Sequence, residues 1–177
     1  MEERTVGSTH PFRGRRISVR VDEVLREDGH RTTREIVEHP GAVAILAWDA
    51  EAGRVAMVRQ WRHATGKTLL EIPAGTLEPD EPPEATARRE LAEECGLEAA
   101  TWEEGPRFYT APGFCTELMH LYLATNLSST AAHLADADEQ IEASWLTLDD
   151  ALAACDDGRI EDGKSMAGLA WLARRLR

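Results

Sequence analysis

The sequence has few cysteines and no pattern that would pair them. Cys95, Cys115 and Cys155 are odd in number and far apart, and no CxxC pair occurs. Disulfide-rich secreted domains and structural zinc sites both need closely spaced or paired cysteines. The sequence therefore indicates neither class, and isolated thiols are typical of a reducing compartment. We expect a cytoplasmic protein.

Long hydrophobic runs are also missing. The most apolar stretch, "GAVAILAW", ends at Asp49 and is far shorter than the roughly 20 residues that a membrane-spanning helix needs. The first sixteen residues, "MEERTVGSTHPFRGRR", contain no apolar segment of the kind found in signal peptides. We therefore expect no membrane association.

Positive charge is scarce. The chain has 20 Lys and Arg residues against 32 Asp and Glu residues, a formal net charge of −12. Surfaces that follow nucleic-acid phosphates are basic, so we expect no nucleic-acid polymer as a partner. A small phosphorylated ligand remains compatible, provided that local arginines or a bound cation offset the general negative field.

The pattern of apolar residues predicts one mixed α/β domain spanning residues 1–177. Alternating and β-branched runs predict strands, and apolar residues at helical spacing predict helices. The strands outnumber the helices without regular β–α alternation, which favours a mixed sheet with helices packed on it. The expected strands cover residues 16–25, 33–39, 42–49, 54–62, 68–75, 107–111, 117–127 and 140–148, and the expected helices cover 82–95, 148–158 and 165–177.

One expected helix carries acidic residues where they are least favourable. Glu90, Glu93 and Glu94 lie three and four residues apart on one face, just before the helix ends at Gly96. Like charges at this spacing repel, and the helix dipole favours cations at this end. Either the two neighbouring arginines relieve the repulsion, or a divalent cation does. Carboxylate oxygens prefer hard ions such as Mg²⁺ or Mn²⁺.

The segment that leads into this helix carries a recognisable pattern. Residues 75–97, "GTLEPDEPPEATARRELAEECGL", match the box G-x5-E-x7-R-E-U-x-E-E-x-G-U, in which U is a bulky aliphatic residue, at all nine fixed positions. The chain thereby resembles the Nudix hydrolases, and the resemblance extends from about residue 16 to residue 172. It implies the Nudix α/β/α sandwich with a mixed sheet.

Segments outside the box resemble the ADP-ribose pyrophosphatase branch of that family. They include "REIVEHPGAVAIL", "VAMVRQWR", "EIPAG" and "YTAPGFCTELMHLYLA", in which Pro112 stands at the position whose proline marks the branch. The resemblance implies Mg²⁺-dependent hydrolysis of ADP-ribose to AMP and ribose 5-phosphate. The alternatives are a Nudix hydrolase of another nucleoside diphosphate sugar, such as GDP-mannose, and a nucleotide sensor without turnover.

The resemblance also implies the metal ligands. Glu90 and Glu94 would bind Mg²⁺, with Mn²⁺ as a possible substitute, together with the backbone carbonyl of Ala74. Glu93 would hold a second ion or order water. Arg89 would orient the glutamates through charge-assisted hydrogen bonds.

Two glutamates compete for the role of general base. Glu139, in the acidic stretch "DADEQIE", matches the loop glutamate that acts as base in several members of the branch, and Asp138 is the next choice. Glu93 is the alternative, because a carboxylate beside the metal is able to make the same proton transfer.

The substrate contacts follow from the same resemblance. Arg34 and Arg62 would contact the phosphates or the adenine side, and Glu78 and Glu117 would accept hydrogen bonds from ribose hydroxyls. Either Arg34 or Trp61 would stack on adenine. The full expected set is Arg34, Glu35, Arg62, Glu78, Gly113 and Glu117.

The resemblance finally implies a homodimer. ADP-ribose enzymes of this family usually exchange their N-terminal strands, so that both subunits line each site. Residues 16–39 would then contact the substrate of the partner subunit.

Overall fold

The computed structural model describes residues 2–130 and 140–177. These residues form two compact units. The first contains the chain up to Gly41 together with Phe108–Leu118, and the second contains Ala42–Arg107 and Met119–Arg177. The expectation of a single domain over residues 1–177 stays a prediction.

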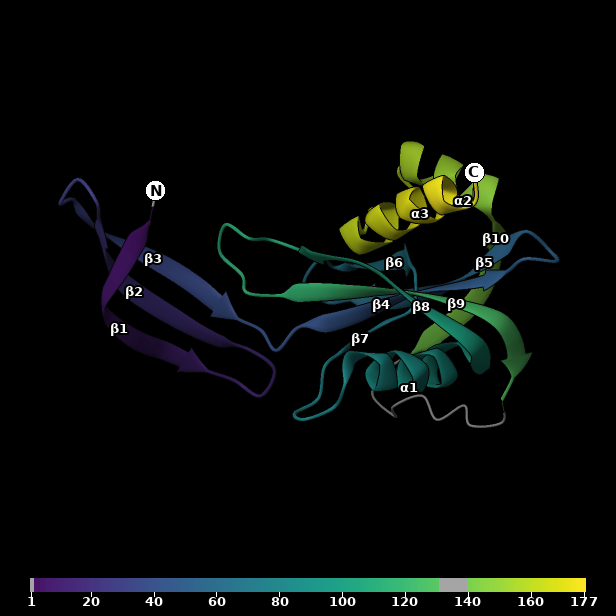
Figure 1. Ribbon diagram of the computed structural model, residues 1–177, viewed down its shortest axis with the longest axis horizontal. Coiled ribbons are helices and arrows are strands. Elements are labelled where there is room, and N and C mark those ends of the chain that lie inside the picture. Colours follow the sequence, from purple (N-terminus) through teal and green to yellow (C-terminus); the bar gives the residue numbers. More distant parts are fainter. Residues whose placement is uncertain (1, 131–139) are drawn as a thin grey trace. The chain divides into compact units, whose positions relative to one another are not determined.

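The first unit is a three-stranded antiparallel sheet with an attached loop. Its strands, β1 (Glu3–Arg13), β2 (Ser18–Arg26) and β3 (Arg31–Glu38), lie in the order β1-β2-β3 (Figure 1). The loop that contains Pro112 is hydrogen-bonded to the end of β3. The Val37 N–H donates to the Phe114 carbonyl at 2.7 Å, and the Thr116 N–H donates to the Val37 carbonyl at 3.0 Å. The sheet edge therefore fixes this loop.

The larger sheet has seven strands and mixed directions. Its main order is β10-β5-β4-β9-β8, while β6 pairs with β5 and β7 pairs with β4. The central strand β4 runs parallel to β9 and antiparallel to β5 and β7. The strands are β4 (Ala42–Asp49), β5 (Arg54–Arg62), β6 (Lys67–Glu71), β7 (Ala74–Thr76), β8 (Leu97–Tyr109), β9 (Leu118–Ser129) and β10 (Ile141–Thr147).

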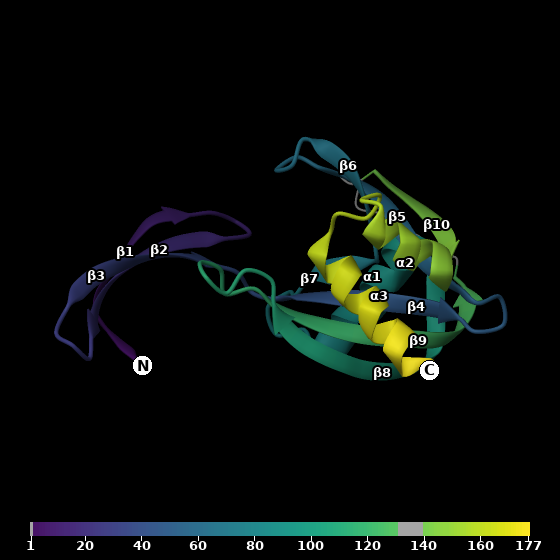
Figure 2. The ribbon, with the colours of Figure 1, turned by 90° about the horizontal axis from the view of Figure 1, so that it is seen from above.

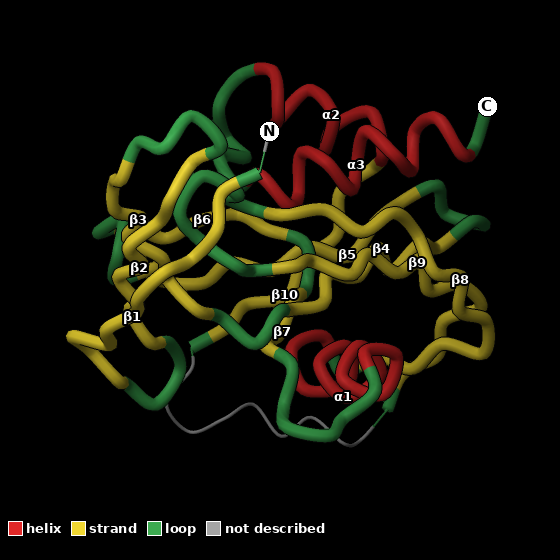
Figure 3. The backbone as a smooth tube through the Cα atoms, turned by 60° about the vertical axis from the view of Figure 1, so that its left-hand side comes forward, coloured by secondary structure: helices red, strands yellow, loops and turns green. Residues whose placement is uncertain are grey.

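Three helices cover the two faces of this sheet. Helix α1 (Pro83–Cys95) lies on one face, and α2 (Leu148–Asp156) and α3 (Gly163–Arg175) lie on the other (Figures 1 and 2). A view from the side shows the same three layers, with the strands between the helices (Figure 3). The predicted mixed sheet with helices packed on it is confirmed. No helix in the described ranges is long and apolar enough to cross a membrane.

The core explains why β4 reads as an unbroken apolar run. Val43 and Ile45 pack in one cluster with Leu91 of α1. On the opposite face, Leu46 lies beside Gly168 of α3, where an added Cβ would stand 3.5 Å from the Leu46 side chain. A strand covered on both faces needs apolar residues at every position, and seven of the eight residues of β4 are buried.

The sequence missed two stretches of strand at sheet edges. The first, β1, is exposed at every position, and the second is the beginning of β8, of which only the final residues were expected. Both stretches carry many charged or polar side chains on exposed strands. Because an edge strand buries little apolar surface, it lacks the hydrophobic alternation from which strands are predicted.

Candidate functional site

The acidic face of α1 lies against the turn that joins β6 to β7. The Glu94 carboxylate accepts a hydrogen bond from the Ala74 N–H at 3.0 Å, and the Glu94 residue is only 4% exposed. Glu90 packs on Gly75 so closely that a Cβ there would lie 2.0 Å from Glu90 Oε1. The structure thus brings three of the predicted metal-site residues, Ala74, Glu90 and Glu94, to one place.

The central strand positions this turn. Ala74 of β7 pairs with Ala44 of β4, and the Pro73 carbonyl accepts a hydrogen bond from the Ile45 N–H at 2.8 Å. Helix α1 then begins at Pro83 and ends at Cys95. The next residue, Gly96, has a φ of 62° and forms the left-handed cap that glycine adopts without strain. The C-terminal boundary agrees with the one expected from sequence, and the helix begins one residue later than expected, because Pro82 is its N-cap.

Arg89 offsets the repulsion between the glutamates on the acidic face of α1. Its guanidinium donates to Glu90 at 2.8 Å and to Glu93 at 2.9 Å, and it also reaches Glu81 at 3.2 Å. Burial disfavours the charged guanidinium, but the bonds to Glu81, Glu90 and Glu93 outweigh burial and raise the pKa of Arg89. The predicted orienting contact between Arg89 and the box glutamates is therefore present in the geometry.

Glu81 ties the start of α1 to its middle. The hydrogen bond from Arg89 is the main cause that lowers the pKa of the Glu81 carboxyl, burial opposes it, and a hydrogen bond from Thr86 at 2.8 Å adds to it. In the sequence, Glu81 stands out only as the first glutamate of the box. Its bond to Arg89, eight residues away, fixes the arginine that holds the other glutamates.

The donor set fits a hard divalent cation. Every candidate ligand is oxygen: the Glu90 and Glu94 carboxylates and the Ala74 carbonyl. Among the residues with described positions, no three His, Cys, Asp or Glu side chains form a ready-made metal cage. Mg²⁺ usually takes one or two carboxylates and completes its shell with water and substrate phosphates. A partial protein shell with the glycine cradle at Gly75 suits that mode of binding.

Arg62, an expected phosphate contact, is held by a buried carboxylate. Its Nε and Nη2 donate to Glu71 at 2.8 and 2.6 Å, in the bidentate arrangement that arginine forms with carboxylates. This bond is the main cause that raises the pKa of Arg62, and the negative charge of Glu94 contributes. Arg62 therefore stands within the electrostatic reach of the metal-site glutamates.

The other expected substrate residues divide between the two units. Glu78 is exposed in the loop before α1, and the Trp61 residue is 55% exposed on β5. In the first unit, Arg34 is paired with Glu3 of β1. Glu117 accepts a hydrogen bond from Thr110 Oγ1 at 2.6 Å. Glu35 and Gly113 are exposed in the same unit. The predicted bases Glu139 and Asp138 lie outside the described residues.

Several buried polar residues near Arg62 were not anticipated. Glu71 and Lys164 form an ion pair between β6 and α3. Gln60, two residues before Arg62 on the same face of β5, has a buried side-chain oxygen with no hydrogen-bond partner among the described residues. An unpaired buried acceptor costs roughly 1–3 kcal/mol, so a water or ligand donor is expected there. The only signal in the sequence was a polar residue within an apolar strand.

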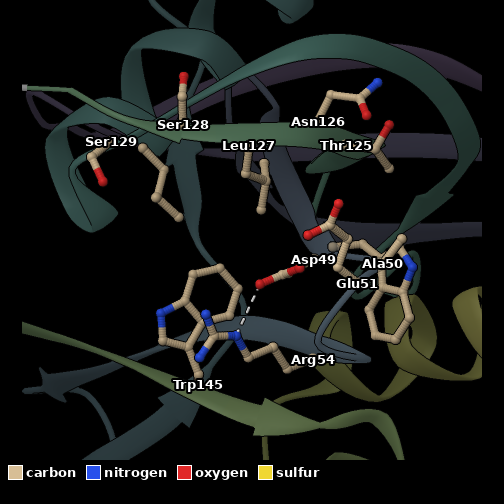
Figure 4. Close-up of a pocket in the computed structure, with 12 residues that line it drawn as sticks. Asp49, Ala50, Glu51, Arg54, Thr125, Asn126, Leu127, Ser128, Ser129 and Trp145 are labelled. Carbon is tan, nitrogen blue, oxygen red and sulfur yellow. Dashed lines mark hydrogen bonds and ion pairs between the residues drawn. The ribbon is translucent and has the colours of Figure 1, made fainter.

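A separate pocket of about 530 Å³ lies at the opposite end of β4, beyond Asp49 (Figure 4). Its cation, Arg54, donates to Asp49 at 3.0 Å and lies 4.5 Å from the Trp145 ring centre. With Glu51 also in the lining, this pocket is acidic and its arginine is engaged. It does not suit a diphosphate, and the turn beside α1 remains the candidate site. The lining comprises Trp48, Asp49, Ala50, Glu51, Arg54, Leu97, Thr125, Asn126, Leu127, Ser128, Ser129 and Trp145.

Comparison with known proteins identifies relatives along nearly the whole chain. The family model of the NUDIX domain matches residues 38–169. The methanol dehydrogenase activator of Bacillus methanolicus is 43% identical over 173 residues, which are 97% of this chain and 92% of that protein. The ADP-ribose pyrophosphatase of Bacillus subtilis (strain 168) is 41% identical over 173 residues, 97% of this chain and 93% of that protein.

A solved structure shares the fold. The crystal structure of an ADP compounds hydrolase matches with a TM-score of 0.86 and covers 99% of this chain and 95% of that chain, at 20% sequence identity. Similarity at this identity is evidence for the fold alone. Together with the family match it confirms the predicted α/β/α sandwich.

Proposed function

Because this chain is a member of the Nudix hydrolase family, we propose that it hydrolyses the diphosphate of ADP-ribose to AMP and ribose 5-phosphate. The observation that carries the proposal is the cradle in which Glu94 holds the Ala74 N–H and Glu90 packs on Gly75. The similarity to an ADP-ribose pyrophosphatase over 97% of the chain supports the choice of substrate. Pro112, in the loop attached to β3, supports it as well.

Glu90, Glu94 and the Ala74 carbonyl would hold Mg²⁺, and Mn²⁺ would suit the same oxygen donors. When bound, such an ion polarises the diphosphate and makes water more acidic. The Glu94 carboxylate accepts a hydrogen bond from the Ala74 N–H and so keeps the Ala74 peptide in place. Arg89 fixes Glu90 and Glu93, so that the carboxylates keep their positions before and after an ion binds.

Other residues of the chain bind the substrate and accept the proton. Arg62, held through Nε and Nη2, binds a phosphate oxygen. Glu139 takes the proton of the attacking water, with Glu93 as the alternative base. Replacing Glu139 by Gln is then expected to lower kcat by about 10²–10⁴-fold, the usual range for a general base. Asp138→Asn tests the next candidate in the same way. If both variants stay within about threefold of the parent, the role passes to Glu93, and a large loss in Asp138→Asn alone would pass it to Asp138.

We also propose that the protein forms a homodimer. In the first unit, Phe12 is 52% exposed and Val6 and Ile17 are also exposed, an apolar content that suits contact with a second copy. The strands within residues 16–39 would reach the partner's site and bring Arg34, Glu35 and the loop of Gly113 and Glu117 to the substrate. Three free cysteines suit a cytoplasmic location.

A substrate panel tests the proposed function. Purified protein with Mg²⁺ is assayed on ADP-ribose, GDP-mannose, UDP-glucose, NADH and diadenosine polyphosphates. We expect ADP-ribose to have the highest kcat/KM. A rival substrate that exceeds it tenfold, about 1.4 kcal/mol of transition-state binding, would assign the enzyme to another nucleoside diphosphate derivative. Tight binding of ADP-ribose without turnover would identify a sensor.

A further inference from the structure

Arg62 of β5 belongs to a cluster of charged side chains to which β6 and α3 also contribute. The Glu71 carboxylate at the end of β6 binds Arg62 through two hydrogen bonds and also accepts one from the Lys164 ammonium at the start of α3. Lys164 in turn donates to Asp162, the N-cap of α3, at 2.9 Å. The side chains of Glu71 and Lys164 are 2% and 9% exposed, whereas that of Arg62 is 37% exposed. The Lys164 cluster consists of Arg62, Glu71, Asp162, Lys164 and Ser165.

The Lys164 cluster also clamps the turn of the candidate metal site. Ser165 Oγ donates to Asp162 at 2.5 Å and accepts the Ile72 N–H at 2.8 Å. Two residues after Ile72, the Ala74 N–H donates to Glu94 of α1. Helix α3 therefore holds one end of this turn, and α1 holds the other.

Stability alone is a poor explanation for such a cluster. Removing each charge from water costs several kcal/mol, and apolar replacements of buried ion pairs are often neutral or stabilising. What the network does supply is geometry, because the positions of several donors and acceptors are fixed together. Arg62 is its solvent-accessible cation, and the charge of Glu94 acts on it. The network thus fixes the position of Arg62 at the edge of the candidate site.

We propose that Lys164 is a positioning residue that acts through Glu71 to set Arg62 for the substrate diphosphate. Lys164 holds the Glu71 carboxylate in the orientation that engages Nε and Nη2 of Arg62, and the third nitrogen, Nη1, then binds a phosphate oxygen. The single negative charge of Glu71 is shared between Lys164 and Arg62. Glu71 therefore does not fully neutralise the charge of Arg62. This inference rests on the proposed function and extends its binding site to α3.

A double-mutant cycle separates positioning from general support of the fold. Lys164→Met, Arg62→Ala and the double variant are compared by kcat, KM and the Kd of ADP-ribose. In the parent background, Lys164→Met is expected to lower kcat/KM by about 10²-fold, mainly through KM, because small displacements of a binding group have effects of this size. In the Arg62→Ala background its effect is expected to shrink to within about threefold, because the two residues act as one unit.

The control is Lys67→Met. Lys67 forms an exposed ion pair with Glu161 close to α3 and lies outside the Lys164 cluster, so this variant is expected to behave like the parent. Equal losses from Lys164→Met in both backgrounds would overturn the proposal, as would a similar loss from Lys67→Met. Lys164→Arg keeps the charge and is expected to recover part of the loss in KM.

The remaining outcomes are also decisive. If the melting curve shows that Lys164→Met does not fold, Asp162→Asn replaces it in the cycle, because asparagine still caps α3. If the parent prefers another nucleoside diphosphate sugar, the proposed substrate is wrong, and the cycle is read with that substrate because the diphosphate is shared. If the parent turns over none of them, the Kd of ADP-ribose gives the coupling. Additive effects in any of these measurements reject the role of Lys164.

Discussion

At the scale of single residues, the candidate site is organised by one arginine among acids. Arg89 contacts Glu81, Glu90 and Glu93, whereas Glu94 lies deeper and is bonded to the Ala74 backbone. The box can therefore fold with its charges largely compensated before any cation binds. Glu94 is the carboxylate at which the presence of a metal is expected to matter most for stability.

Thermal unfolding of Glu94→Gln tests this role of Glu94. Glutamine keeps an oxygen for the Ala74 N–H and removes a negative charge from a helix C-terminus, a change typically worth ~0.3–1 kcal/mol. In EDTA the variant is therefore expected to melt at or above the parent's temperature. With Mg²⁺ the order reverses, because only the parent gains full binding energy. Equal Mg²⁺ shifts in both proteins, or a clearly less stable variant in EDTA, would make Glu94 a structural residue.

At the scale of elements, the short strand β7, between β6 and α1, is the part of the site that requires glycine. A Cβ on Gly75 would overlap the Glu90 carboxylate, the movable end of a side chain, so Gly75→Ala is expected to displace Glu90 and leave the fold intact. Activity should fall about 10²-fold or more, as for other displaced catalytic groups. Gly163→Ala, at a position with open space, is the control and should retain activity. A fully active Gly75→Ala protein would show that Glu90 is not needed at this point.

These elements also show which parts of the fold and of the site could be predicted from the sequence. The start and end of α1 follow from Pro83 and Gly96, and the buried strand β4 follows from its apolar run, because these signals are local. The acidic residues of the site could be predicted because the box fixes their spacing. The bond between Glu71 and Lys164 could not, because it joins positions 93 residues apart and neither residue has a distinctive neighbour pattern. Exposed strands such as β1 leave no hydrophobic pattern at all.

At the scale of the whole molecule, the predicted site residues fall in two groups. The metal-site residues and Arg62 belong to the second unit, while Arg34, Glu35, Gly113 and Glu117 belong to the first. A homodimer in which each site combines the second unit of one chain with the first unit of its partner would bring the groups together. Such an isologous arrangement makes a specific prediction for mixed dimers.

Complementation between two inactive variants tests the shared site. Glu94→Gln damages the second unit, and Arg34→Ala damages the first. In a mixed dimer with shared sites, one site combines both defects and the other is intact. Random assembly of equal amounts should therefore restore about a quarter of parental kcat per subunit. A mixture of Glu94→Gln with Glu90→Gln, both altered in the same unit, is the control and should stay inactive. Activity in the first mixture no higher than the mean of its two components would place each complete site within a single chain.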